Sequence, residues 1–276
     1  MEWLKSLIFG LVSGIAEFLP VSGWAHGLLL AKMFGKESML EINTLSCHLG
    51  GLVAVIFLTK QGWQRLFREQ RIYRTPQRKR PRPADGKTIL QFRLLKKAAL
   101  ILGIAMILTG RMGPLSRRMG WVAFLVFLNG CINLVSDRLP KGNKDGRSVA
   151  AVDGVLVGFG GTLGILPGMS ALGGTLCVFL MRGFDPVFAV ENSLLLTVPA
   201  LAGCVLGDII RMVSAGFGGF SLSTALSCLF AAGGTFAGAF FGILEIRRAA
   251  EKKEFSRFAY YCWGLALFML IMYLTV

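Results

Sequence analysis

Six long, mostly apolar runs constrain the fold of this chain more than any other feature. They lie at residues 42–60, 94–110, 119–136, 192–212, 219–244 and 257–275. A helix that crosses a bilayer needs about 20 mostly apolar residues, and these runs come close to that length. Only 16% of the 276 residues are charged, which leaves too little polar surface to cover a soluble protein of this size. We therefore predict an all-α polytopic membrane protein with about six transmembrane helices.

The positive charge is concentrated between two of these runs. The formal net charge is +15, and many of the Lys and Arg residues lie in or beside residues 61–93. Cytoplasmic loops of membrane proteins collect Lys and Arg, so this pattern predicts a basic cytoplasmic loop at 61–93. No nucleic-acid partner is expected, because the segment shows no recognisable nucleic-acid-binding module. The six cysteines are scattered and form no CxxC pair, which favours neither disulfides nor a zinc site.

Two further apolar stretches, 6–34 and 152–182, are each broken near the middle. The breaks contain Pro20 and Pro167, each followed closely by small or polar residues. Proline removes a backbone donor and ends a helix. A broken helix survives at membrane depth only where protein or a water-filled cavity covers the freed backbone groups. The two stretches therefore predict re-entrant helix hairpins.

The two hairpins also resemble each other, since Gly14–Pro20 aligns with Gly161–Pro167. Paired broken segments are typical of inverted repeats that hold a site between their halves. We predict a single membrane domain, 1–276, made of halves 1–136 and 137–276. With the basic loop inside, the first hairpin enters from outside and the second from inside. One cluster opposes this orientation because it would lie outside: Arg111, Arg117 and Arg118.

The first hairpin carries the strongest candidates for chemistry: Glu17, Ser22 and His26. Ionisable residues inside a membrane are costly and are functional candidates by default. A carboxylate, a hydroxyl and an imidazole around a helix break suit acid–base or metal-assisted work on a phosphate. Freed backbone N–H groups at helix N-termini suit the phosphate itself. For His48, beside Cys47, an ordinary hydrogen-bonded histidine is the favoured interpretation.

The second hairpin offers glycines that allow close backbone approach and hydroxyls that donate to phosphate oxygens. Tight packing of helices through small residues explains the same pattern equally well, and both interpretations stay open. The candidate phosphate-binding residues are Gly168, Ser170, Gly173, Gly174 and Thr175.

At these residues the sequence resembles the bacitracin-resistance family of undecaprenyl pyrophosphate phosphatases. The resemblance is carried by Gly14-x-x-Glu17-Phe18-Leu19-Pro20-Val21-Ser22-x-x-x-His26, by Leu166-Pro167-Gly168-x-Ser170 with Thr175, and more weakly by the rest of the chain. It implies an inverted-repeat fold and hydrolysis of the lipid diphosphate to the monophosphate, in lipid-carrier recycling for the cell envelope. It also implies a divalent cation (Mg or Ca) with Glu17 as a ligand, a bacterial inner membrane location with the site facing outside, and admits a homodimer.

Several positions depart from the family pattern. Ser13 stands where the family usually has a second glutamate, and Gly23 replaces the second of two serines. Ala171 and Leu172 stand where the family usually has Arg-Ser. An arginine gives a diphosphate fork-like, charge-assisted hydrogen bonds that alanine cannot. The leading hypothesis is therefore a divergent phosphatase acting on a polyprenyl diphosphate, with Glu17 as base or metal ligand, His26 as acid–base partner and Ser22 binding phosphate. The alternative is a relative that binds or translocates a polyprenyl phosphate, or another anion, without cleaving it.

Overall fold

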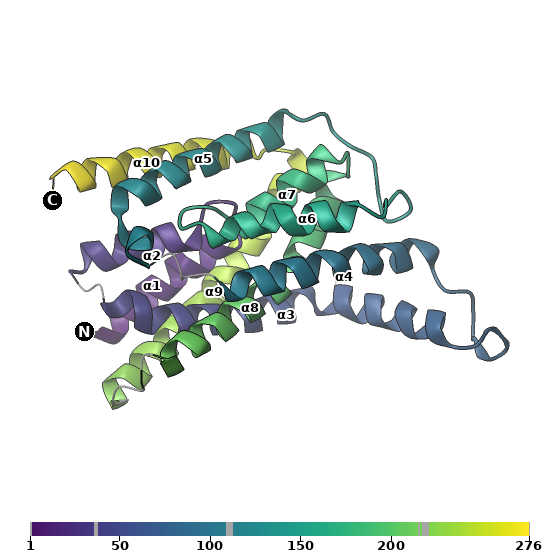
Figure 1. Ribbon diagram of the computed structural model, residues 1–276, viewed down its shortest axis with the longest axis horizontal. Coiled ribbons are helices and arrows are strands. Elements are labelled where there is room, and N and C mark those ends of the chain that lie inside the picture. Colours follow the sequence, from purple (N-terminus) through teal and green to yellow (C-terminus); the bar gives the residue numbers. More distant parts are fainter. Residues whose placement is uncertain (1, 36–37, 109–112, 215, 217–220, 276) are drawn as a thin grey trace.

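The computed structural model describes residues 2–35, 38–108, 113–214, 216 and 221–275. Within that part, ten α-helices pack side by side into an elongated bundle (Figure 1). The helices are α1 (Glu2–Glu17), α2 (Gly23–Met33), α3 (Ser38–Arg74), α4 (Gly86–Ile107), α5 (Met119–Arg138), α6 (Asp153–Gly161), α7 (Ala171–Met181), α8 (Pro186–Ser214), α9 (Leu222–Lys252) and α10 (Ser256–Thr275). Short 3-10 helices are η1 (Gln77–Lys79), η2 (Gly113–Arg117) and η3 (Thr162–Ile165).

Five of these helices, α3, α5, α8, α9 and α10, are long and apolar enough to cross a membrane. The sixth predicted span, α4, has 22 residues but carries Lys87, Arg93, Lys96 and Lys97 between its start and its middle. Large apolar side chains lie on the surface, and Phe240, Phe241 and Leu267 are each more than half exposed. Acyl chains, unlike water, cover such a surface without cost. The prediction of an all-α, multi-pass membrane protein is confirmed.

The basic segment 61–93 is not the loop that the sequence predicted. Helix α3 continues to Arg74 and α4 begins at Gly86, so most of the segment is helical. The 37 residues of α3 span about 55 Å at ~1.5 Å per residue, well beyond a hydrocarbon core of about 30 Å. The helix ends at Arg74, two residues before Pro76, which lacks the backbone N–H needed to continue the helical hydrogen bonds. The pair α3–α4 therefore projects beyond one end of the bundle (Figure 1).

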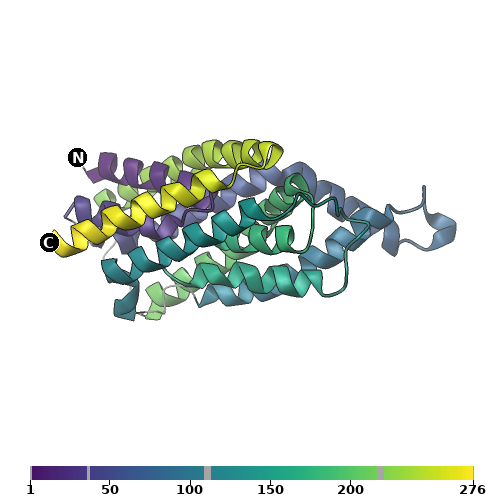
Figure 2. The same ribbon diagram turned by 90° about the horizontal axis from the view of Figure 1, so that it is seen from above.

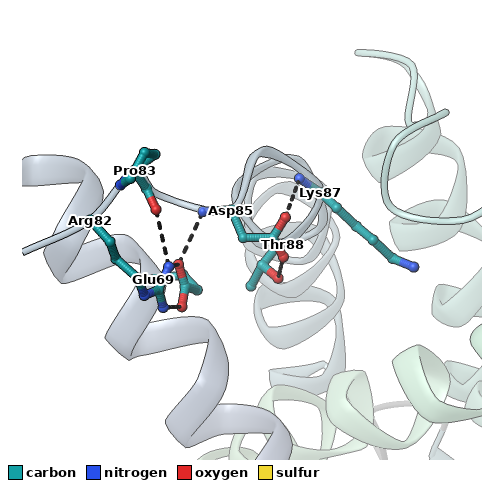
Figure 3. Close-up of polar contacts among 6 residues, drawn as sticks. All are labelled: Glu69, Arg82, Pro83, Asp85, Lys87 and Thr88. Carbon is teal, nitrogen blue, oxygen red and sulfur yellow. Dashed lines mark hydrogen bonds and ion pairs between the residues drawn. The ribbon is translucent and has the colours of Figure 1, made fainter.

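Hydrogen bonds hold the turn between α3 and α4 (Figure 3). Glu69 forms an ion pair with Arg82 and accepts a hydrogen bond from the backbone N–H of Asp85 at 3.1 Å. Asp85 caps α4, accepting from the backbone N–H of Lys87 at 3.2 Å and from the Thr88 hydroxyl at 2.5 Å. The hydrogen bond from Thr88 is the main cause that lowers the pKa of Asp85 below its usual value. The projecting hairpin is thus a defined structure.

The two broken stretches enter the bundle from opposite ends. Helix α1 begins at the end where both chain termini lie, whereas α6 begins at the end of the α3–α4 hairpin (Figures 1 and 2). Packing partners are exchanged between the halves: α1 packs on α9 as α6 packs on α4, and α3 packs on α9 as α8 packs on α4. The equivalent pairs α3 with α8 and α5 with α10 contact each other. This exchange is the pattern that two halves related by a two-fold axis produce.

Small residues let α1 lie directly on α9. A Cβ atom added to Gly14 would lie 2.3 Å from the carbonyl oxygen of Thr235, and one added to Gly238 would lie 2.2 Å from that of Leu11. Side chains at these positions would force the helices apart. Close approach through small residues is a main source of helix association in membranes. It fixes α1, and with it Glu17 at its end, in the centre of the bundle.

Asn129 of α5 joins the two helix breaks. Its side-chain N–H donates to the carbonyl oxygen of Pro20 at 2.7 Å, and its side-chain oxygen accepts from the backbone N–H of Ser170 at 3.0 Å. Asn133, one turn later, donates to the same Pro20 oxygen at 2.6 Å. The hydroxyl of Ser170 donates to the carbonyl oxygen of Leu19 at 3.4 Å. The breaks therefore meet, and one amide side chain satisfies backbone groups of both.

Replacing Asn129 by Ala should destabilise the protein by about 1–3 kcal/mol, because the buried N–H of Ser170 loses its partner while the Pro20 oxygen keeps the hydrogen bond from Asn133. Thermal unfolding of the purified protein in detergent measures the effect. Asn143→Ala is the control, since Asn143 is exposed in the loop before α6. Equal unfolding midpoints for both variants would contradict the role given to Asn129.

Candidate active site

Glu17, the last residue of α1, lies against the first residue of α2. A Cβ atom added to Gly23 would lie only 2.4 Å from Oε2 of Glu17. The glycine therefore makes room for the carboxylate at the start of α2. The N-terminus of a helix carries a partial positive charge that stabilises a nearby anion. Glu17, which the sequence predicted as a reactive group, therefore lies at a helix N-terminus, a position that favours anions.

Ser22 has a structural function at this turn. It is the N-cap of α2, and its hydroxyl accepts from the backbone N–H of Ala25 at 3.4 Å. Its φ of +73° is one that few residues other than glycine adopt. Strained residues of this kind gather at functional sites. The side chain is buried and does not line the cavity described below, so the structure gives it no direct contact with a ligand there.

Ser170 caps α7 in the same way that Ser22 caps α2. Its hydroxyl accepts from the backbone N–H of Gly173 at 3.1 Å. Gly168, with a φ of +118°, leaves no room for a side chain, because a Cβ would lie 2.8 Å from the carbonyl oxygen of Val122. The break can therefore lie directly on α5, and α7 starts at Ala171 in the interior of the bundle.

The other residues predicted in the second hairpin serve packing. A Cβ at Gly173 would lie 3.1 Å from the side chain of Pro20, and one at Gly174 would lie 2.1 Å from the carbonyl oxygen of Gly160. The hydroxyl of Thr175 donates to the carbonyl oxygen of Leu172 at 2.9 Å. For Gly174 and Thr175, the structure matches the packing interpretation that the sequence left open.

A cavity of about 110 Å³ lies where the two breaks meet. Helix α2 reaches it with Gly23 and Trp24, and α7 reaches it with Ala171, directly after its cap Ser170. Two helix N-termini therefore border one cavity, and each brings the positive end of its dipole and a first turn whose N–H groups have no partner within the helix. Such an arrangement binds phosphate without a further charged group. The polar side chains that line it are Ser13, Glu17, Thr44, His48, Ser116, Ser170, Asp208, Arg211 and Thr235.

His48, which the sequence interpretation considered an ordinary histidine, and Asp208, which it missed, are both functional candidates. Nδ1 of His48 on α3 lies 2.6 Å from a carboxylate oxygen of Asp208 on α8, and Arg211 forms an ion pair with the other carboxylate oxygen. His48 does have the hydrogen-bonding partner expected of an ordinary histidine, but it also lines the cavity with Glu17. An available signal was Asp208 itself, an acid inside the apolar run 192–212.

His26, in contrast, lies behind α2. Its Nδ1 is 2.8 Å from the carbonyl oxygen of Ser22, and its Nε2 is 2.7 Å from the hydroxyl of Tyr261. The imidazole also stacks on the Tyr261 ring, with centroids 5.7 Å apart. The buried ring is not among the cavity-lining residues. The structure therefore brings Glu17 and Ser170 to the cavity but not His26.

The donor set does not fit a resident metal ion. Over the described ranges, no group of three His, Cys, Asp or Glu side chains gathers in a way that could hold one. Two carboxylates line the cavity, and that of Asp208 already pairs with His48 and Arg211. Glu17 alone is too few ligands for a protein-held Mg²⁺ or Ca²⁺, although Mg²⁺ is often bound through substrate phosphates, waters and one carboxylate.

Comparisons with known proteins identify the family. A family model described as "Bacitracin resistance protein BacA" matches residues 6–268. Similar curated proteins include "Undecaprenyl-diphosphatase" of Carboxydothermus hydrogenoformans, 31% identical with 99% of this chain and 98% of that protein covered. "Undecaprenyl-diphosphatase 1" of Shouchella clausii is 30% identical (98% and 96% covered), and "Undecaprenyl-diphosphatase" of Methanobrevibacter smithii is 28% identical (98% of each). The resemblance inferred from the two hairpin motifs is confirmed, and the chain belongs to the bacitracin resistance protein BacA family.

Proposed function

We propose that this protein hydrolyses undecaprenyl diphosphate to undecaprenyl phosphate and inorganic phosphate in the membrane. The observation that carries the proposal is the cavity bordered by the N-termini of α2 and α7, with the carboxylate of Glu17 between them. The similar proteins reported above carry the name undecaprenyl-diphosphatase, and this chain matches them over almost their whole length. Both facts support this substrate.

The two helix N-termini are proposed to bind the diphosphate. Backbone N–H groups at the start of α2 and α7 donate to phosphate oxygens, and the positive dipole ends offset the negative charge of the ligand. Ser13 and Ser170 add hydroxyls to the cavity lining. Half-helices whose N-termini point at an anion near the membrane midplane are a recurrent way of binding anionic substrates in inverted-repeat proteins.

Glu17 is proposed as the general base. A water molecule attacks the terminal phosphorus, and Glu17 takes one of its protons. The bond from that phosphorus to the bridging oxygen breaks, and the electron pair remains on the bridging oxygen of the lipid monophosphate. The water oxygen and its second proton leave with inorganic phosphate. A divalent cation, as the family resemblance implies, would be held mainly by the diphosphate and waters, and would offset phosphate charge.

We also propose the orientation expected from sequence. The basic α3–α4 hairpin lies at the opposite end from both chain termini (Figure 1), and Lys and Arg favour the cytoplasmic side. Asp208 and Arg211, in the last two turns of α8, line the cavity, and we propose that it opens on their side, toward the end with both chain termini. The cavity then faces outward from a bacterial inner membrane.

Glu17→Gln should lower phosphate release from undecaprenyl diphosphate by about 100-fold or more, because general-base catalysis typically supplies 10²–10⁴-fold. The assay uses purified protein in detergent with Mg²⁺ or Ca²⁺ present. Glu245→Gln is the matched control, since Glu245 pairs with Arg257 near the end of α9 and does not line the cavity. Wild-type protein that binds the lipid diphosphate but releases no phosphate would reject hydrolysis and select the binding or translocating alternative.

Gly23→Ala should lower the same activity by about 10- to 100-fold. The added Cβ would lie 2.4 Å from Oε2 of Glu17 and displace the carboxylate, and a shift of about 1 Å can cost ~100-fold in rate. Gly264→Ala serves as control because nothing lies within 4 Å of its added Cβ. Full activity of Gly23→Ala would show that the position of Glu17 does not matter.

A further inference from the structure

We propose that His48, oriented by Asp208, is the imidazole that works with Glu17 during catalysis, in the role that the sequence assigned to His26. This inference rests on the proposed phosphatase function and adds a catalytic residue, His48, and a positioning residue, Asp208. Its basis is the arrangement of side chains in the cavity.

The geometry leaves one nitrogen of His48 for a ligand. Nδ1 is held by the Asp208 carboxylate at 2.6 Å, so only Nε2 remains to face the cavity that the ring lines. The Glu17 carboxylate lies within electrostatic range of the same ring. A carboxylate that accepts from one ring nitrogen fixes the orientation of the imidazole and stabilises its protonated form. Asp208 therefore gives His48 the fixed orientation and the stabilised protonated form that a catalytic proton donor needs.

Asp208 is itself held in place. Its second carboxylate oxygen accepts from Arg211, one turn further along α8. The Asp208 side chain is 8% exposed and the Arg211 side chain 35%, so the pair reaches from the protein interior toward the surface. In this proposal Arg211 offsets the charge of Asp208, and a protonated His48 offsets that of Glu17. Loss of Asp208 should consequently affect catalysis through His48.

His48 also supplies what Ala171 lacks. Ala171 lines the same cavity but has no hydrogen-bond donor on its side chain. A charge-assisted hydrogen bond from an imidazolium is among the stronger contacts to a phosphate oxygen. His26 is less suited to the task because Ser22 and Tyr261 occupy both of its ring nitrogens.

The proposed step completes the hydrolysis described above. When the bond between the terminal phosphorus and the bridging oxygen breaks, negative charge develops on the bridging oxygen. Nε2–H of His48 donates its proton to that oxygen. Glu17 has meanwhile gained one proton from the attacking water. Return of that proton to His48 through water restores the starting state, so atoms and charges balance over one turnover.

The test compares His48→Gln with His26→Gln in the phosphate-release assay. His48→Gln should lower kcat by about 100-fold, with KM changed less than about threefold, because the proton is donated in the transition state. The loss in His26→Gln should be at least 10-fold smaller. A reversed order would return the acid–base role to His26 and overturn the proposal.

Asp208→Asn tests positioning. It should lower kcat by about 10-fold in wild type and by less than twofold in His48→Gln, since the two residues act as one unit. Glu191→Gln is the matched control: Glu191 lies on α8 and pairs with Arg247 at 2.6 Å, away from the cavity. If the kcat losses of Asp208→Asn and His48→Gln instead multiply in the double variant, and both single variants unfold at a lower temperature, the contact between α3 and α8 is purely structural.

Ala171→Arg separates a missing charge from a damaged fold. In His48→Gln it should restore kcat/KM by about 10-fold or more, because an arginine gives the phosphate a new charge-assisted donor. Absence of any rescue, in a variant that unfolds at the wild-type temperature, would contradict the charge-supplying role of His48. If wild type releases no phosphate at all, the proposed function fails; if wild type is active and His48→Gln is equally active, only this inference fails.

Discussion

The structure depends on one constraint: two helices end in the middle of a membrane protein, and their freed backbone groups must find partners. Asn129 meets this constraint for both breaks at once, bonding Pro20 from one side and Ser170 from the other. Ser22 and Ser170 cap the helices that start there. Since unpaired backbone groups cost several kcal/mol in an apolar environment, this junction requires a specific set of contacts. The N–H groups left at the two N-termini are the ones that a phosphate can use.

Much of the fold follows from local sequence signals. Pro20 and Pro167 interrupt apolar stretches, so the hairpins could be predicted from the residues themselves. The boundary of the basic segment could not, because the edge of a membrane does not end a helix and α3 continues to Arg74. The sequence placed Glu17 and Ser170 in the site, and both line the cavity. His48 and Asp208 are 160 positions apart, and no periodicity or motif predicts a contact between two such distant residues.

The departures from the family pattern acquire a physical meaning in the cavity. Gly23 leaves space for the Glu17 carboxylate, which a larger residue at that position would displace. Ser13 and Ala171 line the same cavity without adding charge. The charged groups that do line it, beyond Glu17, come from α3 and α8, which pack on each other. The chemistry of this protein is therefore best understood as shared between the broken hairpins and the long helices beside them.

The most direct measurement of the central claim is an experimental structure with a non-hydrolysable undecaprenyl diphosphate analogue bound. The account predicts both phosphorus atoms between the first turns of α2 and α7, with backbone N–H groups of both helices donating to phosphate oxygens and Glu17 beside the terminal phosphate. A diphosphate bound elsewhere, or held by only one of the two helix N-termini, would contradict it.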